Sequence, residues 1–226
     1  MIGIYLIVII SMGASWYIGY KLKKKFKEYS EVSIGQNLSG KEIAEKMLRD
    51  NGIYDVKVIS VEGELTDHYN PLNKTVNLSP DVYYGRNISA AAVAAHECGH
   101  AVQHATAYTF LQMRSRLVPI VSFSSNWLQW VLLGGVLLIG VFPYLLFFGI
   151  IMFAMTTLFS FITLPVEIDA SSRALAWLTN SRLADNEQYD KAKDALKWAA
   201  RTYVVAALSS LAMLLYYVMI FMGRRN

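Results

Sequence analysis

Two histidines and a glutamate near the middle of the chain have the spacing of a hydrolytic zinc site. They belong to the segment His96-Glu97-Cys98-Gly99-His100, an HExxH pattern. Because residues four apart lie on one face of a helix, His96 and His100 can hold one Zn²⁺ ion between consecutive turns. Bound zinc lowers the pKa of a water molecule to about 7, and Glu97 is placed to take its proton during attack on a carbonyl group. The pattern therefore predicts zinc-dependent hydrolysis with one Zn²⁺ per chain. Cys98 is expected to be a small buried residue.

A catalytic zinc ion needs a third protein ligand and one open position. His104 continues the spacing, but it would lie about 12 Å along a helix from His96, so we interpret it as a residue beside the site or at the surface. Glu167 is the preferred candidate, because Pro165 can end one helix and open another with Glu167 in its first turn. Asp169 is the second candidate. Both acids also have a simpler interpretation, because the helix dipole stabilises negative charges in the first turn of a helix. Only the HExxH pattern upstream favours the interpretation as zinc ligands.

The composition indicates a membrane protein. Of 226 residues, 54% are hydrophobic and 17% charged, and the mean hydropathy is +0.33, whereas soluble chains are about 45–50% apolar and about 25% charged. The single cysteine excludes an intramolecular disulfide and a cysteine-based metal cage. Four apolar runs, each long enough for a hydrocarbon layer of about 30 Å, cover residues 2–20, 117–139, 142–164 and 203–222.

The positions of the basic residues predict an orientation. Lysines follow the first apolar run instead of preceding it, so this run is expected to be an uncleaved anchor with the N-terminus outside. Nineteen of the 21 basic residues then face the cytoplasm, and only Arg224 and Arg225 lie outside. The positive-inside rule explains this basic excess, so we expect no nucleic-acid partner. The predicted localisation is the cell membrane, with several spans and a catalytic site that faces the cytoplasm.

We therefore expect an α-helical polytopic membrane protein with four transmembrane helices and a small α+β, zincin-like cytoplasmic domain. The expected parts are an anchor at 1–20, a catalytic segment at 21–116, a transmembrane hairpin at 117–164, a cytoplasmic helical segment with the third zinc ligand at 165–202, and the fourth span with a short tail at 203–226.

Local patterns predict the elements of the catalytic segment. Ser39 and Glu42 form a capping-box pattern for a helix that stops at Asn51-Gly52. Strands are expected at 54–61 and 75–78, joined by a turn-rich link over 66–73. Ser79-Pro80 predicts a short helix. Ser89 is the expected N-cap of the alanine-rich zinc helix, which must run obliquely or break near 106–109 before the second span.

The chain resembles the YugP-like family of membrane zinc metallopeptidases. The stretches that carry the resemblance are LTDHYNPLNKTVNLSPDVY, ISAAAVAAHECGHAVQHA, LPVEIDASSRAL and YVVAALSSLAMLLYY. The chain is also similar, more distantly, to the HtpX and CAAX-processing proteases, in which an HExxH helix pairs with a later glutamate at the cytoplasmic membrane face. The resemblance implies that His96, His100 and Glu167 bind zinc and that Glu97 is the general base.

One position departs from the wider pattern. Thermolysin-like enzymes usually place an aspartate four residues after the glutamate ligand, where it orients a ligand histidine, and here that position is Ser171. We expect Asp169 or Arg173 to take this role. His68, Tyr69 and Arg173 are candidates for stabilising the oxyanion of the reaction, although a structural role for His68 is left open. An edge strand near His68 would accept a peptide by strand addition.

These features predict a membrane-embedded zinc metallopeptidase that acts on membrane-associated proteins or peptides. The alternative is a zinc-binding membrane scaffold or adaptor with little proteolytic activity, which the intact Glu97 disfavours. A small-solute channel is a third hypothesis, motivated by Asn126 and Gln129 in the second run. The absence of charged residues within the runs disfavours it, and helix–helix contacts explain these polar residues better. The sequence is compatible with an oligomer or a regulatory membrane partner.

Overall fold

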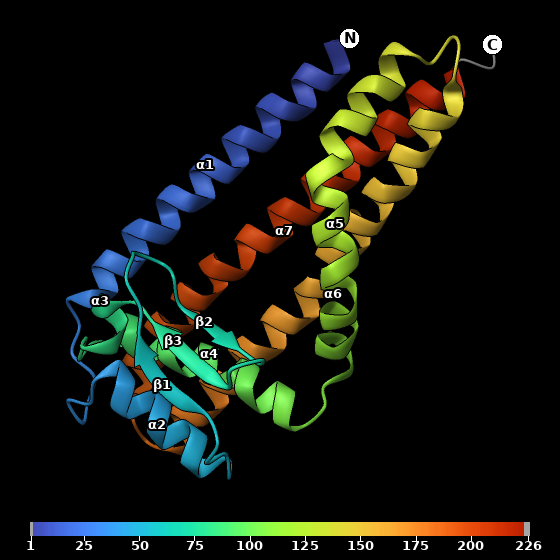
Figure 1. Cartoon of the computed structure of the whole chain (residues 1–226). Coiled ribbons are helices and arrows are strands. Elements are labelled where there is room, and N and C mark those ends of the chain that lie inside the picture. The colour runs from blue at the N-terminus through green and yellow to red at the C-terminus, as the bar shows by residue number, and fades with distance from the viewer. Residues whose placement is uncertain (1, 224–226) are drawn as a thin grey trace. The chain divides into compact units, whose positions relative to one another are not determined.

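The structure is a computed structural model that describes residues 2–223, and it is mostly helical (Figure 1). Its elements are α1 (Ile2–Ser30), α2 (Gly40–Asp50), β1 (Lys57–Ser60), β2 (His68–Asn70), β3 (Thr75–Leu78), α3 (Pro80–Tyr83), α4 (Ile88–Ala105), α5 (Thr109–Leu137), α6 (Pro143–Asn180) and α7 (Asn186–Gly223). The described residues divide into two compact units, one built from 2–17, 112–164 and 202–223 and the other from 18–111 and 165–201. Arg224 and Arg225 lie outside the described residues.

The four apolar runs all lie in long helices. Among the described residues, α1, α5, α6 and α7 are long and apolar enough to cross a membrane, so the structure has as many candidate spans as the sequence predicted. Each helix extends beyond the predicted apolar run at one end or both. Large apolar side chains such as Trp127 and Trp130 stay exposed on α5, as expected for a surface that lipid would cover.

Close helix contacts hold the first unit together. Gly135 of α5 lies against α6, where an added Cβ would stand 2.6 Å from the Cα of Leu146. Farther along α6, a hydrogen bond of 2.7 Å joins the hydroxyls of Thr157 and Ser210, the latter on α7. Small residues and hydroxyls commonly make such contacts between membrane helices.

The second unit contains a three-stranded sheet in the order β1-β3-β2. β1 is parallel to β3, with Val58 opposite Val76, and β2 is antiparallel, with Tyr69 opposite Val76. The predicted strand at 75–78 is confirmed, whereas β1 is shorter than predicted. The prediction of a link without a strand was wrong, because β2 forms within it. The side chain of Asn70 accepts the backbone N–H groups of Leu72 and Asn73, and this tight turn closes the β2–β3 hairpin.

The zinc-pattern helix α4 begins earlier than predicted. Its N-cap is Asn87 and not Ser89, because the Asn87 side chain accepts the N–H of Ala90 at 2.8 Å from an extended backbone. The predicted break after this helix is confirmed. α4 ends at Ala105, and Ala107 has a left-handed φ of 52° before α5 begins.

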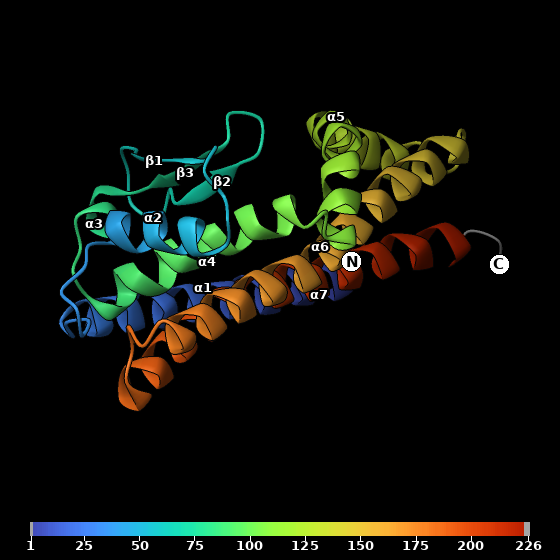
Figure 2. The same cartoon turned by 90° about the horizontal axis from the view of Figure 1, so that it is seen from below.

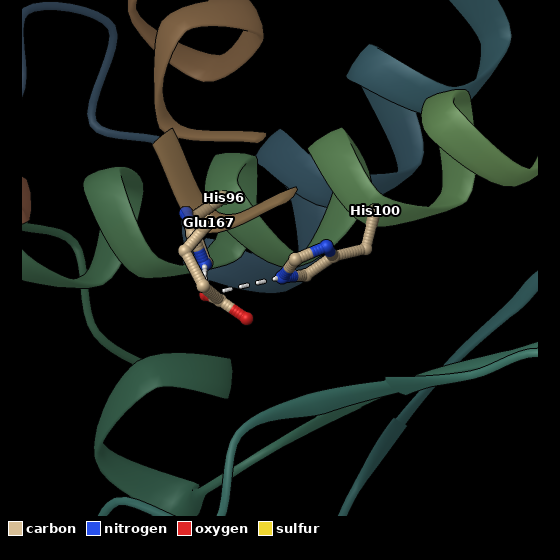
Figure 3. Close-up of side chains that lie close together, drawn as sticks. All are labelled: His96, His100 and Glu167. Carbon is tan, nitrogen blue, oxygen red and sulfur yellow. Dashed lines mark ion pairs between the residues drawn. The ribbon is translucent and has the colours of Figure 1, made fainter. Parts of the chain in front are cut away.

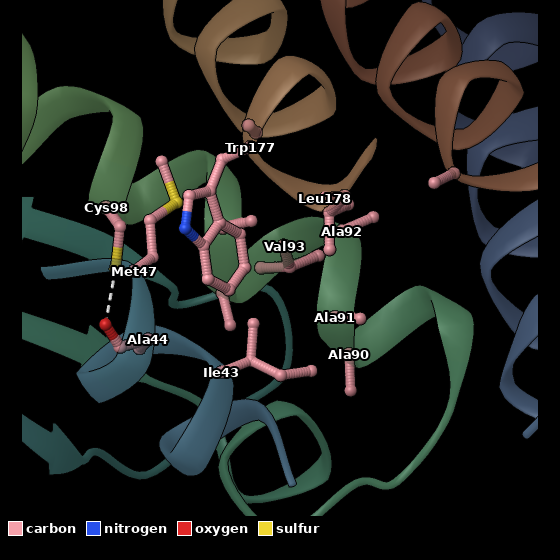
Figure 4. Close-up of a cluster of buried hydrophobic side chains, with 14 of the residues drawn as sticks. Ile43, Ala44, Met47, Ala90, Ala91, Ala92, Val93, Cys98, Trp177 and Leu178 are labelled. Atoms are coloured by element: carbon pink, nitrogen blue, oxygen red, sulfur yellow. Dashed lines mark hydrogen bonds between the residues drawn. The ribbon is translucent and has the colours of Figure 1, made fainter. Parts of the chain in front are cut away.

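A tight helix pair forms the core of the second unit. The capping box of Ser39 and Glu42 is confirmed, and it opens α2, whose apolar face packs on the alanine-rich face of α4 (Figure 4). Met47 and Cys98 are buried where the two helices meet, and the Cys98 thiol donates to the Ala44 carbonyl. Figure 2 shows the sheet on one side of α4 and the C-terminal half of α6 on the other.

Pro165 does not end a helix, contrary to the prediction. α6 continues through it from Pro143 to Asn180. An interior proline costs one helix hydrogen bond. The turns that follow it are nevertheless held by packing, because Val166, Ala170 and Ala174 are fully buried. Glu167 consequently lies in the middle of a helix, so a favourable place on the dipole at a helix start does not explain it.

Candidate metal centre

Three side chains from two helices meet in the second unit. His96 and His100 lie on one face of α4, and Glu167 reaches them from α6 (Figure 3). The Oε2 atom of Glu167 is 3.3 Å from Nε2 of His96 and 3.6 Å from Nε2 of His100. One potential ligand atom from each residue lies within 4.8 Å of the others. The three form one group that could hold a metal ion.

The close contact of α4 and α6 brings these side chains together. Gly99, between the two histidines, faces Ala170 of α6, and a Cβ on Gly99 would stand 2.5 Å from the Ala170 carbonyl oxygen. Only a residue without a side chain allows this approach. Glu167 is one turn before Ala170 and is therefore held over the histidine pair.

The group is largely withdrawn from water. Glu167 is 3% exposed, and His100 and Glu97 are each 8% exposed. Burial lowers the pKa of His100, but its hydrogen bond to Glu167 and the charges of Glu97 and Glu167 outweigh burial and leave this pKa raised. Among the ion pairs of the described residues, none involves the Glu97 carboxylate.

The other ring nitrogen of each histidine has a neutral partner. Nδ1 of His96 is hydrogen-bonded to the Ser171 hydroxyl at 3.1 Å, and Nδ1 of His100 to Oε1 of Gln103 at 3.0 Å. Both rings thus turn Nε2 toward Glu167. Ser171, four residues after Glu167, contacts His96 even though it carries no charge.

Gln103 is a residue that the sequence analysis missed. It is fully buried, and its Nε2 donates to the Val166 carbonyl at 2.7 Å and to Oδ2 of Asp169 at 2.8 Å. It lies three residues after His100 and so on the same side of the helix, which is the only signal in the sequence that marks it.

Asp169 and Arg173 are near the group but do not join it. Oδ2 of Asp169 accepts from Nε of Arg173 at 2.6 Å as well as from Gln103, and Asp169 is not among the three residues that could share a metal. Its link to His100 runs through Gln103. Arg173 also lies over the ring of Tyr108, 5.7 Å from its centroid.

The two oxyanion candidates on β2, Tyr69 and His68, differ in their surroundings. The Tyr69 hydroxyl is hydrogen-bonded to Nδ1 of His104 at 2.8 Å, which places it beside α4 one turn after His100. Burial, followed by the charge of Asp55, raises the pKa of Tyr69, so its phenol keeps its proton. His68 is exposed and donates from Nδ1 to the Thr66 carbonyl. His104 is not part of the metal group.

Bond lengths allow a test of whether this group suits zinc. Zinc binds nitrogen and carboxylate oxygen at about 2.0–2.2 Å in a tetrahedron, which separates neighbouring ligand atoms by about 3.3–3.6 Å. The two distances from Glu167 to the histidines have these values. Two imidazoles and one carboxylate are also a common ligand set of catalytic zinc.

Comparisons with known proteins agree with this chemistry. A family model described as "putative neutral zinc metallopeptidase" matches residues 4–222. A curated protein of Bacillus subtilis (strain 168), named "putative membrane protease YugP", is 43% identical over 220 residues, which cover 97% of each chain. No solved structure matches the chain.

Proposed function

Because the chain belongs to this family of zinc metallopeptidases, we propose that it is a membrane-embedded zinc endopeptidase whose ligands are His96, His100 and Glu167. The convergence of these three side chains on one point is the observation that supports the proposal. The four candidate spans and the membrane protease relative support a multi-pass membrane protein.

Each side chain then has a definite task. His96 and His100 offer Nε2 and Glu167 offers a carboxylate oxygen, which leaves the fourth position of a tetrahedral site for water or substrate. Zinc, when bound, supplies Lewis acidity that activates water near neutral pH and polarises a carbonyl group. Glu97 follows His96 on the helix, where its buried carboxylate would accept the proton of the attacking water and pass it to the departing amine.

The substrate is proposed to be an extended segment of a membrane-associated protein. β2 is an edge strand of the sheet, so one side of it is available for backbone hydrogen bonds with a peptide. The basic residues of 21–116 and 165–202 favour a cytoplasmic position for the site by the positive-inside rule.

The test is the zinc content of the full chain purified in detergent, with Glu167→Ala and Asp169→Ala side by side. We expect one zinc per chain in the wild type, loss of zinc in Glu167→Ala and its retention in Asp169→Ala. Loss of zinc from Asp169→Ala alone would transfer the third ligand to Asp169. A wild type that binds no zinc would overturn the proposal and favour a scaffold without hydrolytic activity.

A further inference from the structure

One buried amide links His100 of the metal group to the helix that carries Glu167. Gln103 touches His100 on its own helix, and on α6 it touches Val166, the neighbour of Glu167, and Asp169. It has no exposed surface. Its two hydrogen bonds to Val166 and Asp169 therefore depend on α4 and α6 keeping one relative position.

The hydrogen-bond acceptors around Gln103 determine the orientation of its amide. The Val166 carbonyl can only accept a hydrogen bond, and Oδ2 of Asp169, which already takes the N–H of Arg173, also accepts. The NH₂ group of Gln103 must face these two oxygens. Its oxygen must then face His100.

The orientation of the amide determines the tautomer of His100. Because Oε1 of Gln103 has no hydrogen to give, Nδ1 of His100 must donate. In the neutral ring, Nε2 then carries the lone pair, on the side where Glu167 lies. The hydrogen bond also fixes the rotation of the ring.

We propose that Gln103 is a positioning residue that sets the tautomer and ring orientation of His100 and locks the α6 segment carrying Glu167 against α4. The proposal rests on the proposed zinc site. It gives an uncharged amide the task that a carboxylate performs in the common carboxylate–histidine–zinc arrangement.

Ser171 is a useful comparison. Its hydroxyl also contacts a histidine of the group, but it can donate or accept, so it does not impose a tautomer on His96. It lies on α6 and makes one contact to α4. We therefore expect Ser171→Ala to weaken zinc binding less than loss of the Gln103 amide does.

The experiment compares zinc affinity, measured by chelator competition, in the detergent-purified full chain. Gln103→Leu keeps the volume and removes every hydrogen bond, and we expect it to weaken zinc binding about 10- to 100-fold, as partners of metal ligands commonly do. Gln103→Glu places a carboxylate against Asp169 and should weaken binding similarly. Adding Asp169→Asn to Gln103→Glu restores a carboxylate–amide pair in the opposite direction, and we expect it to recover part of the loss, because the Val166 carbonyl still lacks its donor.

Two further measurements separate positioning from general stability. The visible absorption of the fully Co²⁺-loaded protein reports ligand geometry, and it should change in Gln103→Leu and return toward the wild type in the double variant. Gln188→Leu is the matched control, since Gln188 also joins two segments, donating to the Ser33 carbonyl, but contacts no residue of the metal group. It should alter the melting temperature of the metal-free protein without changing zinc affinity.

The outcomes distinguish the two proposals. If Glu167→Ala abolishes zinc binding but the Gln103 variants bind zinc within twofold of the wild type, the positioning role is wrong and the zinc site stands. If the double variant binds zinc no more tightly than Gln103→Glu does, the positioning role is also wrong. This comparison remains available if Gln103→Leu does not fold. If Glu167→Ala keeps its zinc, the site itself is wrong.

Discussion

Gly99 and Ala170 lie in close contact where the two helices that carry the metal group cross. An added Cβ on Gly99 would lie 2.5 Å from the carbonyl oxygen of Ala170 and 3.1 Å from its Cα. Atoms of a backbone, unlike the end of a flexible side chain, cannot move aside alone. The spacing of α4 and α6, and with it the distance from Glu167 to the histidines, thus depends on one missing methyl group.

Gly99→Ala should therefore separate the helices. We expect a cost of about 1–3 kcal/mol in the free energy of unfolding, typical of an overpacked core, and weaker zinc binding because Glu167 moves with α6. Calorimetry of the metal-free protein and chelator competition measure the two effects. Gly19→Ala on α1, where nothing lies within 4 Å of the added carbon, is the matched control and should be neutral or slightly stabilising. Equal zinc affinity in Gly99→Ala and the wild type would contradict this account.

Glu97→Gln separates binding from chemistry. The amide is close in size to the carboxylate but cannot accept a proton, so we expect zinc content to be unchanged and peptide hydrolysis to fall about 10²- to 10⁴-fold. A fluorogenic peptide assay on protein of measured zinc content checks this. Hydrolysis within threefold of the wild type at full zinc loading would mean that another group is the general base.

Asp67 offers a prediction about pH. Burial raises its pKa, and hydrogen bonds from the backbone and side chain of Ser79 only partly offset this. A carboxyl with a raised pKa in the folded state contributes stability below its unfolded pKa of about 3.9, and the contribution is lost as pH rises through the folded pKa. Asp67→Asn does not titrate, so its melting temperature minus that of the wild type should increase from pH 3 to pH 7. Metal-free protein is used throughout, and a constant or decreasing difference would refute the prediction.

The features that the sequence predicted are those that local chemistry determines. The HExxH spacing places His96 and His100 on one helix face in any α-helix. The Ser39–Glu42 capping box satisfies backbone groups only three residues apart. The four candidate spans follow from the length of the apolar runs alone.

The features that it missed depend on partners far along the chain. β2 has little strand character of its own and forms by pairing with β3. Pro165 stays within α6 because the residues after it are buried, which no local rule for proline includes. Gln103 could be placed beside His100 by its spacing, but its contacts with Val166 and Asp169 arise only when α4 and α6 cross.

Tyr69 is the oxyanion candidate that the surroundings favour. Its hydroxyl is held by His104 on α4, whereas His68 is exposed and already donates from Nδ1 to Thr66. If Tyr69 donates a hydrogen bond to the developing oxyanion, Tyr69→Phe should lower kcat about 10²- to 10³-fold, with little change in KM or zinc content.

His104→Ala removes the group that holds the Tyr69 hydroxyl but leaves that hydroxyl in place. We therefore expect it to lower kcat less than Tyr69→Phe does, and His68→Ala to have the smallest effect of the three. Steady-state kinetics on the three variants at equal zinc loading test this order. A larger loss of kcat in His68→Ala than in Tyr69→Phe would assign the oxyanion contact to His68 instead, because removing the donor to the oxyanion itself costs the most transition-state stabilisation.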